Sequence, residues 1–259
     1  MQDLTLALVQ TDIVWQNPDA NRKMLGDKIR NLNKSVDVVM LPEMFTTGFT
    51  MDVKGNAEPP NGITLEWMKQ LASETKAVLT GSIIVEENGK FFNRLYWVEP
   101  NRQVNSYDKR HLFRMADEEK YFSGGDKSPV MEVKGWKVKP LICYDLRFPV
   151  WSRNVALEYD ILLYVANWPK ARVEAWDTLL KARAIENLCY SIGVNRVGAD
   201  GVEIIYNGQS ACYNFKGESL LEKSANEEIY LIRVSKKELE EYRTKFPAHL
   251  DSDTFKILK

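Results

Sequence analysis

One short, nearly continuous apolar segment constrains the fold of this chain more than any other feature of its sequence. The segment is VDVVMLPE, residues 36–43, and comparable runs occur in KVKPLIC (137–143) and DILLYVANW (160–168). Apolar runs of this length are typical of β-strands that are covered on both faces. Helices or a second sheet must then lie on each side of such strands, which favours a layered α/β architecture.

Strand-like runs alternate with helical patterns along the whole chain. Strands are predicted at residues 4–10, 36–43, 77–87, 91–98, 103–112, 136–143, 160–168, 190–197, 203–214 and 228–234. Helices are predicted at residues 18–33, 64–76, 149–159, 172–189 and 236–246. No linker rich in Gly, Ser or Pro and no internal repeat divides this sequence. We therefore expect a single domain over residues 1–259, with its core at about 4–235 and a C-terminal helix and tail at 236–259.

Composition and short motifs exclude several classes of function. The net charge is −1 and no basic run is present, so we expect no nucleic-acid partner. No apolar stretch approaches the ~18 residues of a membrane span, and the first residues lack the basic start of a signal peptide. Neither a glycine-rich nucleotide motif nor a Cys/His cluster occurs, so no cofactor or metal is expected. The chain has only 3 cysteines, an odd number, which argues against a framework of disulfides. We therefore expect a reducing compartment and a cytoplasmic protein.

Three reactive side chains occupy comparable places in the predicted pattern. Glu43 and Cys143 each end an apolar strand, and Lys109 lies late in the predicted strand 103–112. If the strands of Glu43 and Cys143 are parallel, their carboxyl ends meet at one edge of a sheet, where α/β proteins bind ligands. A turn into the helix near Pro149 would also place Cys143 at a helix N-terminus, where the helix dipole favours the thiolate.

Each of these residues also has a structural interpretation. Cys143 taken alone is more often a core residue than a nucleophile, Glu43 can cap a helix or loop, and Lys109 can be solvated. His111 shares a strand face with Lys109 by period-two spacing and could approach the site, although a structural role is favoured. Cys189 and Cys212 are interpreted as packing residues. On spacing alone, a cysteine hydrolase remains one hypothesis among several.

Three longer motifs give a more specific indication. LPEMFTTGF, YDKRHLF and LICYDLRFP occur in this order along the chain. They resemble the Glu, Lys and Cys motifs of the nitrilase or carbon–nitrogen hydrolase superfamily, and the resemblance extends from the first strand to about residue 235. The segment NWPKARVEAWDTLLKARAIENLCYSIGVNRVG (167–198) is similar to the omega-amidase branch in particular.

The resemblance implies a fold and a set of roles. The fold is a four-layer αββα sandwich, usually paired into a homodimer or larger assembly. Glu43 is implied as the general base, Lys109 as the cation that holds the tetrahedral intermediate, and Cys143 as the nucleophile. We expect the backbone N–H of Tyr144 to stabilise the same oxyanion.

Many members of the superfamily carry a second glutamate just before a Pro-Gly turn. Here ADEEKYFSGGD offers Glu118 and Glu119, with Gly124 where the proline usually stands. Counted back from Gly125, Glu118 is the better match and Glu119 the alternative.

Omega-amidases act on short dicarboxylate monoamides such as 2-oxoglutaramate and 2-oxosuccinamate. The far carboxylate of such a substrate needs a cation, and Arg147 and Arg114 are candidates because guanidinium binds carboxylate bidentately. A structural salt bridge is the alternative interpretation of both arginines. Phe113, Tyr144 and Trp168 are candidate pocket walls, although aromatic residues at such places are as often core residues.

The sequence therefore predicts a cysteine-dependent amidohydrolase that cleaves the terminal carboxamide of a small substrate through a thioester. The same three residues could instead act on N-carbamoyl amino acids, other aliphatic amides or nitriles. A non-catalytic binding or regulatory member of the fold is an alternative of a different class. A Cys–His hydrolase with His111 as the base is a further alternative.

Overall fold

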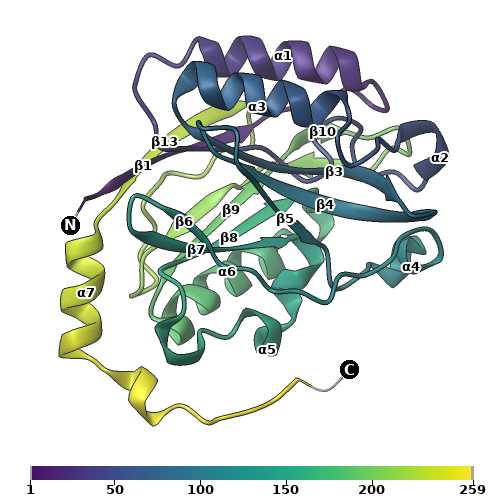
Figure 1. Ribbon diagram of the computed structural model, residues 1–259. Helices are drawn as coiled ribbons and strands as arrows, with labels where there is room; N and C mark the ends of the chain where they lie inside the picture. The colour runs from purple at the N-terminus through teal and green to yellow at the C-terminus, as the bar shows by residue number, and fades with distance from the viewer. Residues whose placement is uncertain (1, 258–259) are drawn as a thin grey trace.

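The computed structural model describes residues 2–257, which form two β-sheets packed face to face (Figure 1). The first sheet contains, in spatial order, β13 (Glu228–Val234), β1 (Leu4–Gln10), β2 (Val38–Met40), β3 (Val78–Glu87), β4 (Lys90–Val98) and β5 (Val104–Asp108). The second contains β12 (Ala211–Tyr213), β9 (Tyr190–Asn195), β8 (Ile161–Ala166), β7 (Trp136–Ile142) and β6 (Met131–Val133).

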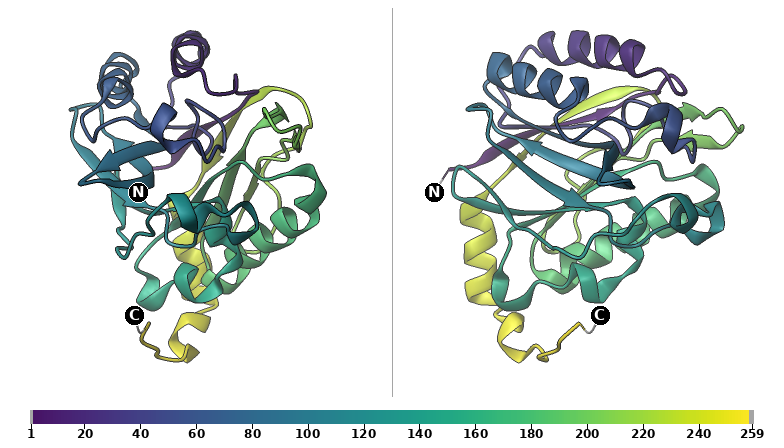
Figure 2. Two further views of the ribbon diagram at one scale, coloured as in Figure 1. Left: turned by 90° about the vertical axis from the view of Figure 1, so that its right-hand side faces the viewer. Right: turned by 45° about the vertical axis from the view of Figure 1, so that its right-hand side comes forward.

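Helices cover the outer face of each sheet. α1 (Pro18–Arg30) and α3 (Ile63–Thr75) lie over the first sheet, and α5 (Pro149–Ser152) and α6 (Val173–Asn187) lie over the second. The two turned views in Figure 2 show the same order of helix, sheet, sheet and helix. The predicted four-layer αββα sandwich is therefore confirmed.

Apolar side chains on both faces of the central strands explain why these strands read as continuous apolar runs. In β1, Leu6 and Leu8 face the core between the sheets, whereas Ala7 and Val9 face the core beneath the helices. Successive side chains of a strand point to opposite faces, so a strand between two cores must be apolar at every position. Val38, Val39 and Met40 of β2 alternate between the two cores in the same way.

Parallel pairing brings several strand ends to one end of the sandwich. β1, β2 and β3 are parallel neighbours in the first sheet, and β7, β8 and β9 are parallel neighbours in the second. The expectation that Glu43 and Cys143 lie on one sheet edge is wrong, because β2 and β7 belong to different sheets. The two residues instead approach each other across the sandwich.

Several predicted elements are shorter in the structure or are divided there, and the strand predicted at 36–43 is only β2, which ends three residues before Glu43. The strand predicted at 103–112 ends at Asp108. The helix predicted at 149–159 is only α5 followed by the 3-10 turn η3 (Val155–Leu157), because the Asn154 side chain bonds both the N–H and the C=O of Tyr159 and closes a loop. The strand predicted at 203–214 is divided into β11 (Ile205–Asn207) and β12 by Gly208, whose φ is +64°.

Short elements without a clear periodic pattern were not predicted. They are α2 (Val53–Asn56), α4 (Glu118–Tyr121), β6, and the 3-10 turns η1 (Arg114–Ala116), η2 (Cys143–Arg147), η4 (Lys170–Arg172) and η5 (Ala248–Asp251). β10 (Val197–Ala199) and β11 form a separate two-stranded hairpin beside the sandwich.

The C-terminal helix α7 (Lys236–Lys245) is fixed to the edge of the sandwich by buried charges. Arg243 Nη1 lies 2.7 Å from Asp160 Oδ1, and Lys236 contacts the other oxygen of the same carboxylate. We call Asp160, Lys236 and Arg243 the anchor cluster. Within residues 2–257, no helix combines the length and the apolar character needed to cross a membrane.

Candidate active site

Three buried ionic side chains meet between the two sheets. Lys109 Nζ lies 2.9 Å from Glu43 Oε1 and 3.0 Å from both carboxylate oxygens of Glu118. The exposed fraction of each side chain is 1% or less. We call these three residues the site cluster. Its ammonium holds together two carboxylates that would otherwise repel each other strongly in a buried environment.

Two asparagines fix the carboxylate of Glu43. Asn93 Nδ2, from β4, donates to Oε1 over 2.8 Å, and the backbone N–H of Asn167 donates to Oε2 over 2.9 Å. Asn167 directly follows β8, and its side-chain amide also donates to the backbone oxygen of Glu43. These bonds join the first sheet to the second at the site.

Lys109 is the first residue after β5, and its backbone is held on both sides. Its N–H donates to the carbonyl oxygen of Asn93, and its carbonyl oxygen accepts from Gly125 N–H, each over 2.9 Å. A Cβ at Gly125 would lie 2.3 Å from the carbonyl oxygen of Asp108, so this close approach requires glycine. Burial alone would lower the pKa of Lys109, but the carboxylates of Glu118 and Glu43 outweigh it and raise that pKa above its ordinary value. The ammonium therefore stays charged.

Glu118, and not Glu119, reaches the site cluster. Glu118 begins α4, and one of its oxygens accepts the backbone N–H of Phe113 over 2.5 Å. Burial raises the pKa of Glu118 above its ordinary value, although Lys109 opposes this. Glu119 does not contact Lys109 and instead pairs with Arg114 over 3.4 Å.

The backbone at Cys143 is strained and firmly supported. Cys143 follows β7 directly and has a φ of +43°, in the left-handed region that residues other than glycine rarely adopt. The carboxylate of Asp145 accepts the N–H of Ile142 over 3.1 Å and the hydroxyl of Tyr107 over 2.7 Å. His111 contacts the other Asp145 oxygen through its backbone N–H at 3.0 Å and its ring Nδ1 at 2.8 Å. This network holds the turn that presents the thiol.

The surroundings of the Cys143 thiol favour its protonated form. Burial raises its pKa well above the ordinary value, the carboxylate of Glu43 raises it further, and Lys109 opposes this only in part. The expectation that a helix dipole favours the thiolate is wrong, because Cys143 begins a 3-10 turn and α5 starts only at Pro149. A base must therefore remove the thiol proton when the sulfur attacks.

A cavity of about 500 Å³ opens onto the thiol. Lys109, Cys143 and Asn167 contribute polar groups to its surface. All three predicted aromatic wall residues, Phe113, Tyr144 and Trp168, also line it. The lining further includes Trp15, Gln16, Phe49, Thr50, Met51, Asp52, Ala116, Arg147, Pro169, Arg172, Asp200, Val202, Ile204 and Tyr206.

Two arginines line this cavity, and only one of them was predicted. Arg147 lies over the ring of Trp168, with 5.2 Å between the guanidinium carbon and the ring centre, and Arg172 lies over Phe113 at the same distance. Among residues 2–257, neither of them is paired with a carboxylate. Arg114 is excluded as a cavity residue, because its side chain is 80% exposed and pairs with Glu119.

His111 packs beneath the site and does not reach the cavity. Its ring stacks on Phe148 with 3.7 Å between the ring centres. The predicted strand face shared with Lys109 is absent, because β5 ends at Asp108, before either residue. Cys189 and Cys212 are completely buried in the core between and beneath the sheets. In the part of the chain that the structure describes, no three His, Cys, Asp or Glu side chains could together hold a metal ion.

Sequence reasoning missed several residues of the site. Asn167 directly follows β8, as Cys143 directly follows β7, so the same strand-end rule would have found it. Asn93 and Arg172 have no comparable signal, because a mid-strand asparagine and an arginine before a helix are common surface residues.

Comparisons with known proteins point to one family. The family described as carbon-nitrogen hydrolase matches residues 5–244. The chain is 42% identical to omega-amidase YafV of Escherichia coli K12, over 99% of this chain and 100% of that protein. It is 32% identical to 2-oxoglutaramate amidase of Bacillus subtilis, over 95% of this chain and 96% of that protein.

Solved structures share the fold of this chain. XC1258 from Xanthomonas campestris, described as a CN-hydrolase superfamily protein with an arsenic adduct in its active site, superimposes with a TM-score of 0.97. Its identity to this chain is 42%, over 99% of this chain and 100% of that one. Nit3 from Saccharomyces cerevisiae shares the fold with a TM-score of 0.87 at 22% identity, over 95% of each chain.

Proposed function

Because this chain belongs to the carbon–nitrogen hydrolase family, we propose that it is an omega-amidase. It is an enzyme that hydrolyses carbon–nitrogen bonds in amides. Its proposed substrates are short dicarboxylate monoamides such as 2-oxoglutaramate and 2-oxosuccinamate, which yield a 2-oxo acid and ammonia. The observation that carries this proposal is the cavity whose lining joins Cys143 and Lys109 to two arginines without carboxylate partners among residues 2–257. The omega-amidase relatives support the same substrate class.

In the proposed reaction, Cys143 is the nucleophile and Glu43 is the general base. The sulfur attacks the carboxamide carbon while Glu43 takes the thiol proton, which the raised pKa of Cys143 makes necessary. Asn93 and Asn167 donate to the two oxygens of Glu43 and thereby keep its carboxylate oriented. Glu118 is a positioning residue, because its oxygens bond Lys109 and the N–H of Phe113, whereas Glu43 also faces the thiol of Cys143.

Negative charge then develops on the carbonyl oxygen of the substrate. Lys109 borders the cavity, and an ammonium has three N–H donors, so one of them is proposed to turn to this oxygen while the others stay on Glu43 and Glu118. The backbone N–H of Tyr144 is the second proposed donor. Each such donor typically contributes about 10²–10³ in rate.

Collapse of the tetrahedral intermediate releases ammonia and leaves a thioester on Cys143. Glu43 returns its proton to the departing nitrogen and next takes a proton from water, which attacks the thioester. Hydrolysis releases the dicarboxylate and restores the thiol.

The far carboxylate of the substrate is proposed to bind Arg147 and Arg172. Both guanidinium groups line the cavity and lie over aromatic rings that keep them in place. Arg147 was a candidate from the sequence and Arg172 was not. The assignment of both arginines therefore rests on their place in the same cavity lining as Cys143.

An ammonia-release assay on a substrate panel tests the proposed function. We expect the highest kcat/KM for 2-oxoglutaramate or 2-oxosuccinamate, and much lower values for carbamoyl-β-alanine, propanamide and a simple nitrile. A preference for carbamoyl-β-alanine or for the nitrile would show that the same residues serve a different substrate class.

The whole chain is proposed to act as one catalytic domain, since residues of both sheets meet at the site. We further propose a homodimer, as the resemblance implies, and a cytoplasmic location, in which Cys143, Cys189 and Cys212 stay as the free thiols seen here. Analytical ultracentrifugation at micromolar concentration distinguishes a dimer from a monomer or a larger assembly.

A further inference from the structure

One buried carboxylate lies between the segment that carries Cys143 and the segment that carries Lys109. Asp145 is completely buried and belongs to the 3-10 turn η2, which begins at Cys143. Its Oδ2 accepts the backbone N–H of Ile142, the residue directly before Cys143, over 3.1 Å. The other bonds of the same carboxylate come from a different part of the chain.

These other partners lie on either side of Lys109 along the chain. Tyr107, two residues before Lys109, donates its hydroxyl to Asp145 Oδ2 over 2.7 Å. His111, two residues after Lys109, donates its backbone N–H to Oδ1 over 3.0 Å, and its ring Nδ1 lies 2.8 Å from the same oxygen. These partners are 38 and 34 residues away from Asp145 in the sequence. The carboxylate therefore joins both sides of Lys109 to the turn of Cys143.

The neighbours of this carboxylate act as hydrogen-bond donors. The Tyr107 hydroxyl accepts the indole N–H of Trp151 over 3.0 Å and the backbone N–H of Arg110 over 3.2 Å, so its own hydrogen points to Asp145. A carboxylate accepts through two oxygens, whereas a side-chain amide has one accepting oxygen and two N–H donors. The substitution Asp145→Asn would therefore place an N–H group against at least one of these donors.

The turn that Asp145 supports has a strained backbone. Cys143 has a φ of +43°, and such a conformation persists only where the surrounding structure determines it. Without the bond to the N–H of Ile142, the turn can relax, and the sulfur then moves relative to Glu43 and Lys109. A displacement of about 1 Å is enough to lower the rate of a reaction about 10²-fold.

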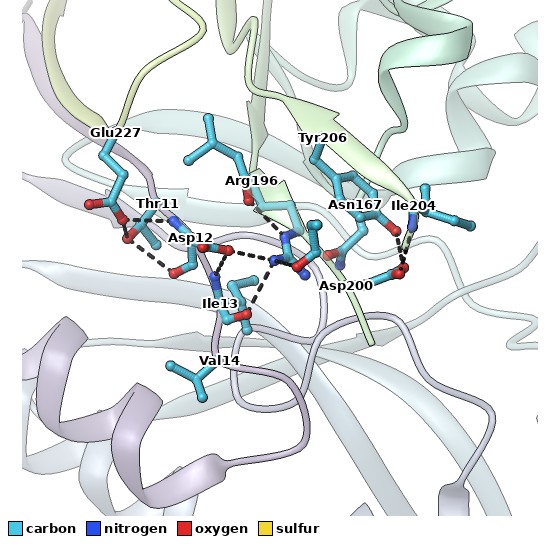
Figure 3. A network of polar contacts seen from close by, with 12 residues as sticks. Thr11, Asp12, Ile13, Val14, Asn167, Arg196, Asp200, Ile204, Tyr206 and Glu227 are labelled. Atoms are coloured by element: carbon cyan, nitrogen blue, oxygen red, sulfur yellow. Dashed lines mark hydrogen bonds and ion pairs between the residues drawn. The ribbon is translucent and has the colours of Figure 1, made fainter. Parts of the chain in front are cut away.

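A second buried carboxylate shows what a purely local arrangement looks like (Figure 3). Asp200 accepts the backbone N–H groups of Val202 and Ile204 over 3.0 and 2.9 Å, and the hydroxyl of Tyr206 over 2.9 Å. All these donors lie within six residues of Asp200, in one hairpin. Asp145 has the same kinds of donors, but they come from segments of both sheets. Its bonds therefore fix one part of the site relative to another.

We propose that Asp145 is a positioning residue that holds the Cys143 thiol in line with the Lys109 ammonium, through Tyr107 and His111. This inference rests on the proposed function, which makes Cys143 the nucleophile and Lys109 an oxyanion donor. Asp145 itself is not among the residues that line the cavity. Its loss therefore changes the alignment of the reacting groups and not the affinity for the substrate.

Asp145→Asn tests the proposal on the full chain, with any amide that the wild type hydrolyses. The folded fraction at the assay temperature is taken from circular dichroism. For the folded molecules, kcat should fall about 10²-fold while KM stays within about twofold of the wild type. An unchanged kcat, or a change confined to KM, would overturn the inference and leave the proposed function intact. A wild type that hydrolyses none of the amides in the panel would overturn the proposed function itself.

Asp160→Asn is the matched control for the loss of a buried carboxylate. Asp160 accepts the backbone N–H of Lys137 over 3.0 Å and pairs with the two cations of the anchor cluster. This variant should unfold at a lower temperature, and its folded molecules should keep the kcat of the wild type. An equal fall of kcat in Asp145→Asn and Asp160→Asn would contradict the proposal, because any buried carboxylate of the fold would then have the same effect.

Tyr107→Phe separates the link between the two segments from the local support of the turn. This variant removes only the hydroxyl and leaves the bond between Asp145 and the N–H of Ile142. We expect kcat to fall about tenfold, the contribution of one hydrogen bond to a charged group. The variant also tests the proposal if Asp145→Asn does not fold. An unchanged kcat would show that Asp145 supports its own turn alone, and the inference would be wrong.

Two variants of His111 distinguish a hydrogen-bond donor from a catalytic base. His111→Asn keeps an N–H donor near the place of Nδ1 and should retain at least about half of kcat, whereas His111→Leu should lose about tenfold. If the ring were the general base, both variants would lose activity equally. That result would contradict the role proposed for Asp145 and His111.

Discussion

Two buried clusters of charged side chains have similar compositions and different surroundings. The site cluster has one cation between the two carboxylates of Glu43 and Glu118, and the anchor cluster has two cations on the carboxylate of Asp160. The site cluster lies beside a thiol and a cavity, whereas no residue of the anchor cluster lines this cavity.

The two clusters also differ in what lies beside their cations. In the anchor cluster, Arg243 Nη1 bonds Asp160, Nε bonds the carbonyl oxygen of Leu188, and Nη2 bonds that of Tyr159. In the site cluster, Lys109 bonds Glu43 and both carboxylate oxygens of Glu118, and it also borders the cavity. A buried charge that contacts only the protein holds the chain together, whereas a buried charge beside a cavity can also act on a ligand.

The largest effect that separates the two clusters is expected from Cys143→Ala. Removing the nucleophile should lower kcat by about 10⁴-fold or more. The midpoint of thermal unfolding should stay close to that of the wild type, because the thiol forms no strong hydrogen bond. The check is ammonia release together with calorimetry, and appreciable turnover by this variant would contradict the assigned nucleophile.

Lys109→Met tests whether the site cluster also contributes to stability. The variant loses an oxyanion donor, so kcat should fall by about 10²–10³. It also leaves Glu43 and Glu118 buried without a cation, so the free energy of unfolding should fall by about 3–5 kcal/mol. Denaturant unfolding and initial rates measure both quantities, and an unchanged stability would mean that the two carboxylates share a proton when Lys109 is absent.

Arg243→Met should affect stability without affecting chemistry. Removing one partner of the buried pair with Asp160 should lower the free energy of unfolding by about 3–5 kcal/mol. At temperatures where the variant stays folded, kcat and KM should equal those of the wild type. Lys237→Met is the matched control on α7, because its pair with Glu241 is exposed and weak, so its effect should stay below about 1 kcal/mol.

The sequence predicted the residues of the site cluster better than it predicted how the strands around them are divided between the two sheets. Glu43 and Cys143 were found because both end apolar strands, and Lys109 and Glu118 because their motifs resemble those of a family. The assignment of β2 and β7 to two different sheets could not be predicted, because strands of either sheet carry the same apolar pattern.

Other parts of the site depend on contacts that leave no local signal. The cavity lining combines Trp15 with Val202 and Ile204, which are distant in the sequence, and the bond of Arg196 to Asp12 helps to bring the two segments together. The prediction of a helix at 149–159 is wrong because the side chain of Asn154 bonds the backbone of Tyr159 in place of helical hydrogen bonds. These side-chain bonds depend on where Tyr159 lies in the folded chain.

A smaller effect is expected when a cavity arginine is changed. Arg147→Met should raise KM for 2-oxoglutaramate about tenfold, the loss of one charge-assisted interaction, and should leave the rate with neutral propanamide unchanged. Arg172→Met should behave in the same way. Arg114→Met is the control, since its exposed side chain pairs with Glu119 outside the cavity. Equal changes for charged and neutral amides would remove Arg147 from the carboxylate role.

The smallest expected effect is on the pH dependence of stability. The pKa of Cys143 is raised in the folded state, so the unfolded chain loses this proton first as the pH rises. The stabilisation is complete below the ordinary thiol pKa of about 8.5 and is lost above it, by up to about 1.4 kcal/mol per pH unit. Between pH 9 and 10, the free energy of unfolding should therefore fall less steeply in Cys143→Ala than in the wild type. Parallel curves would show that the site does not disfavour the thiolate.

The most direct test of the central claim is the mass of the enzyme during turnover. Wild-type protein is mixed with succinamate, quenched with acid, and examined by intact-mass and peptide mass spectrometry. The account predicts a succinyl adduct on the peptide that carries Cys143, and no adduct in Cys143→Ala. Steady turnover with the acyl group on another residue, or by an enzyme that lacks this thiol, would contradict it.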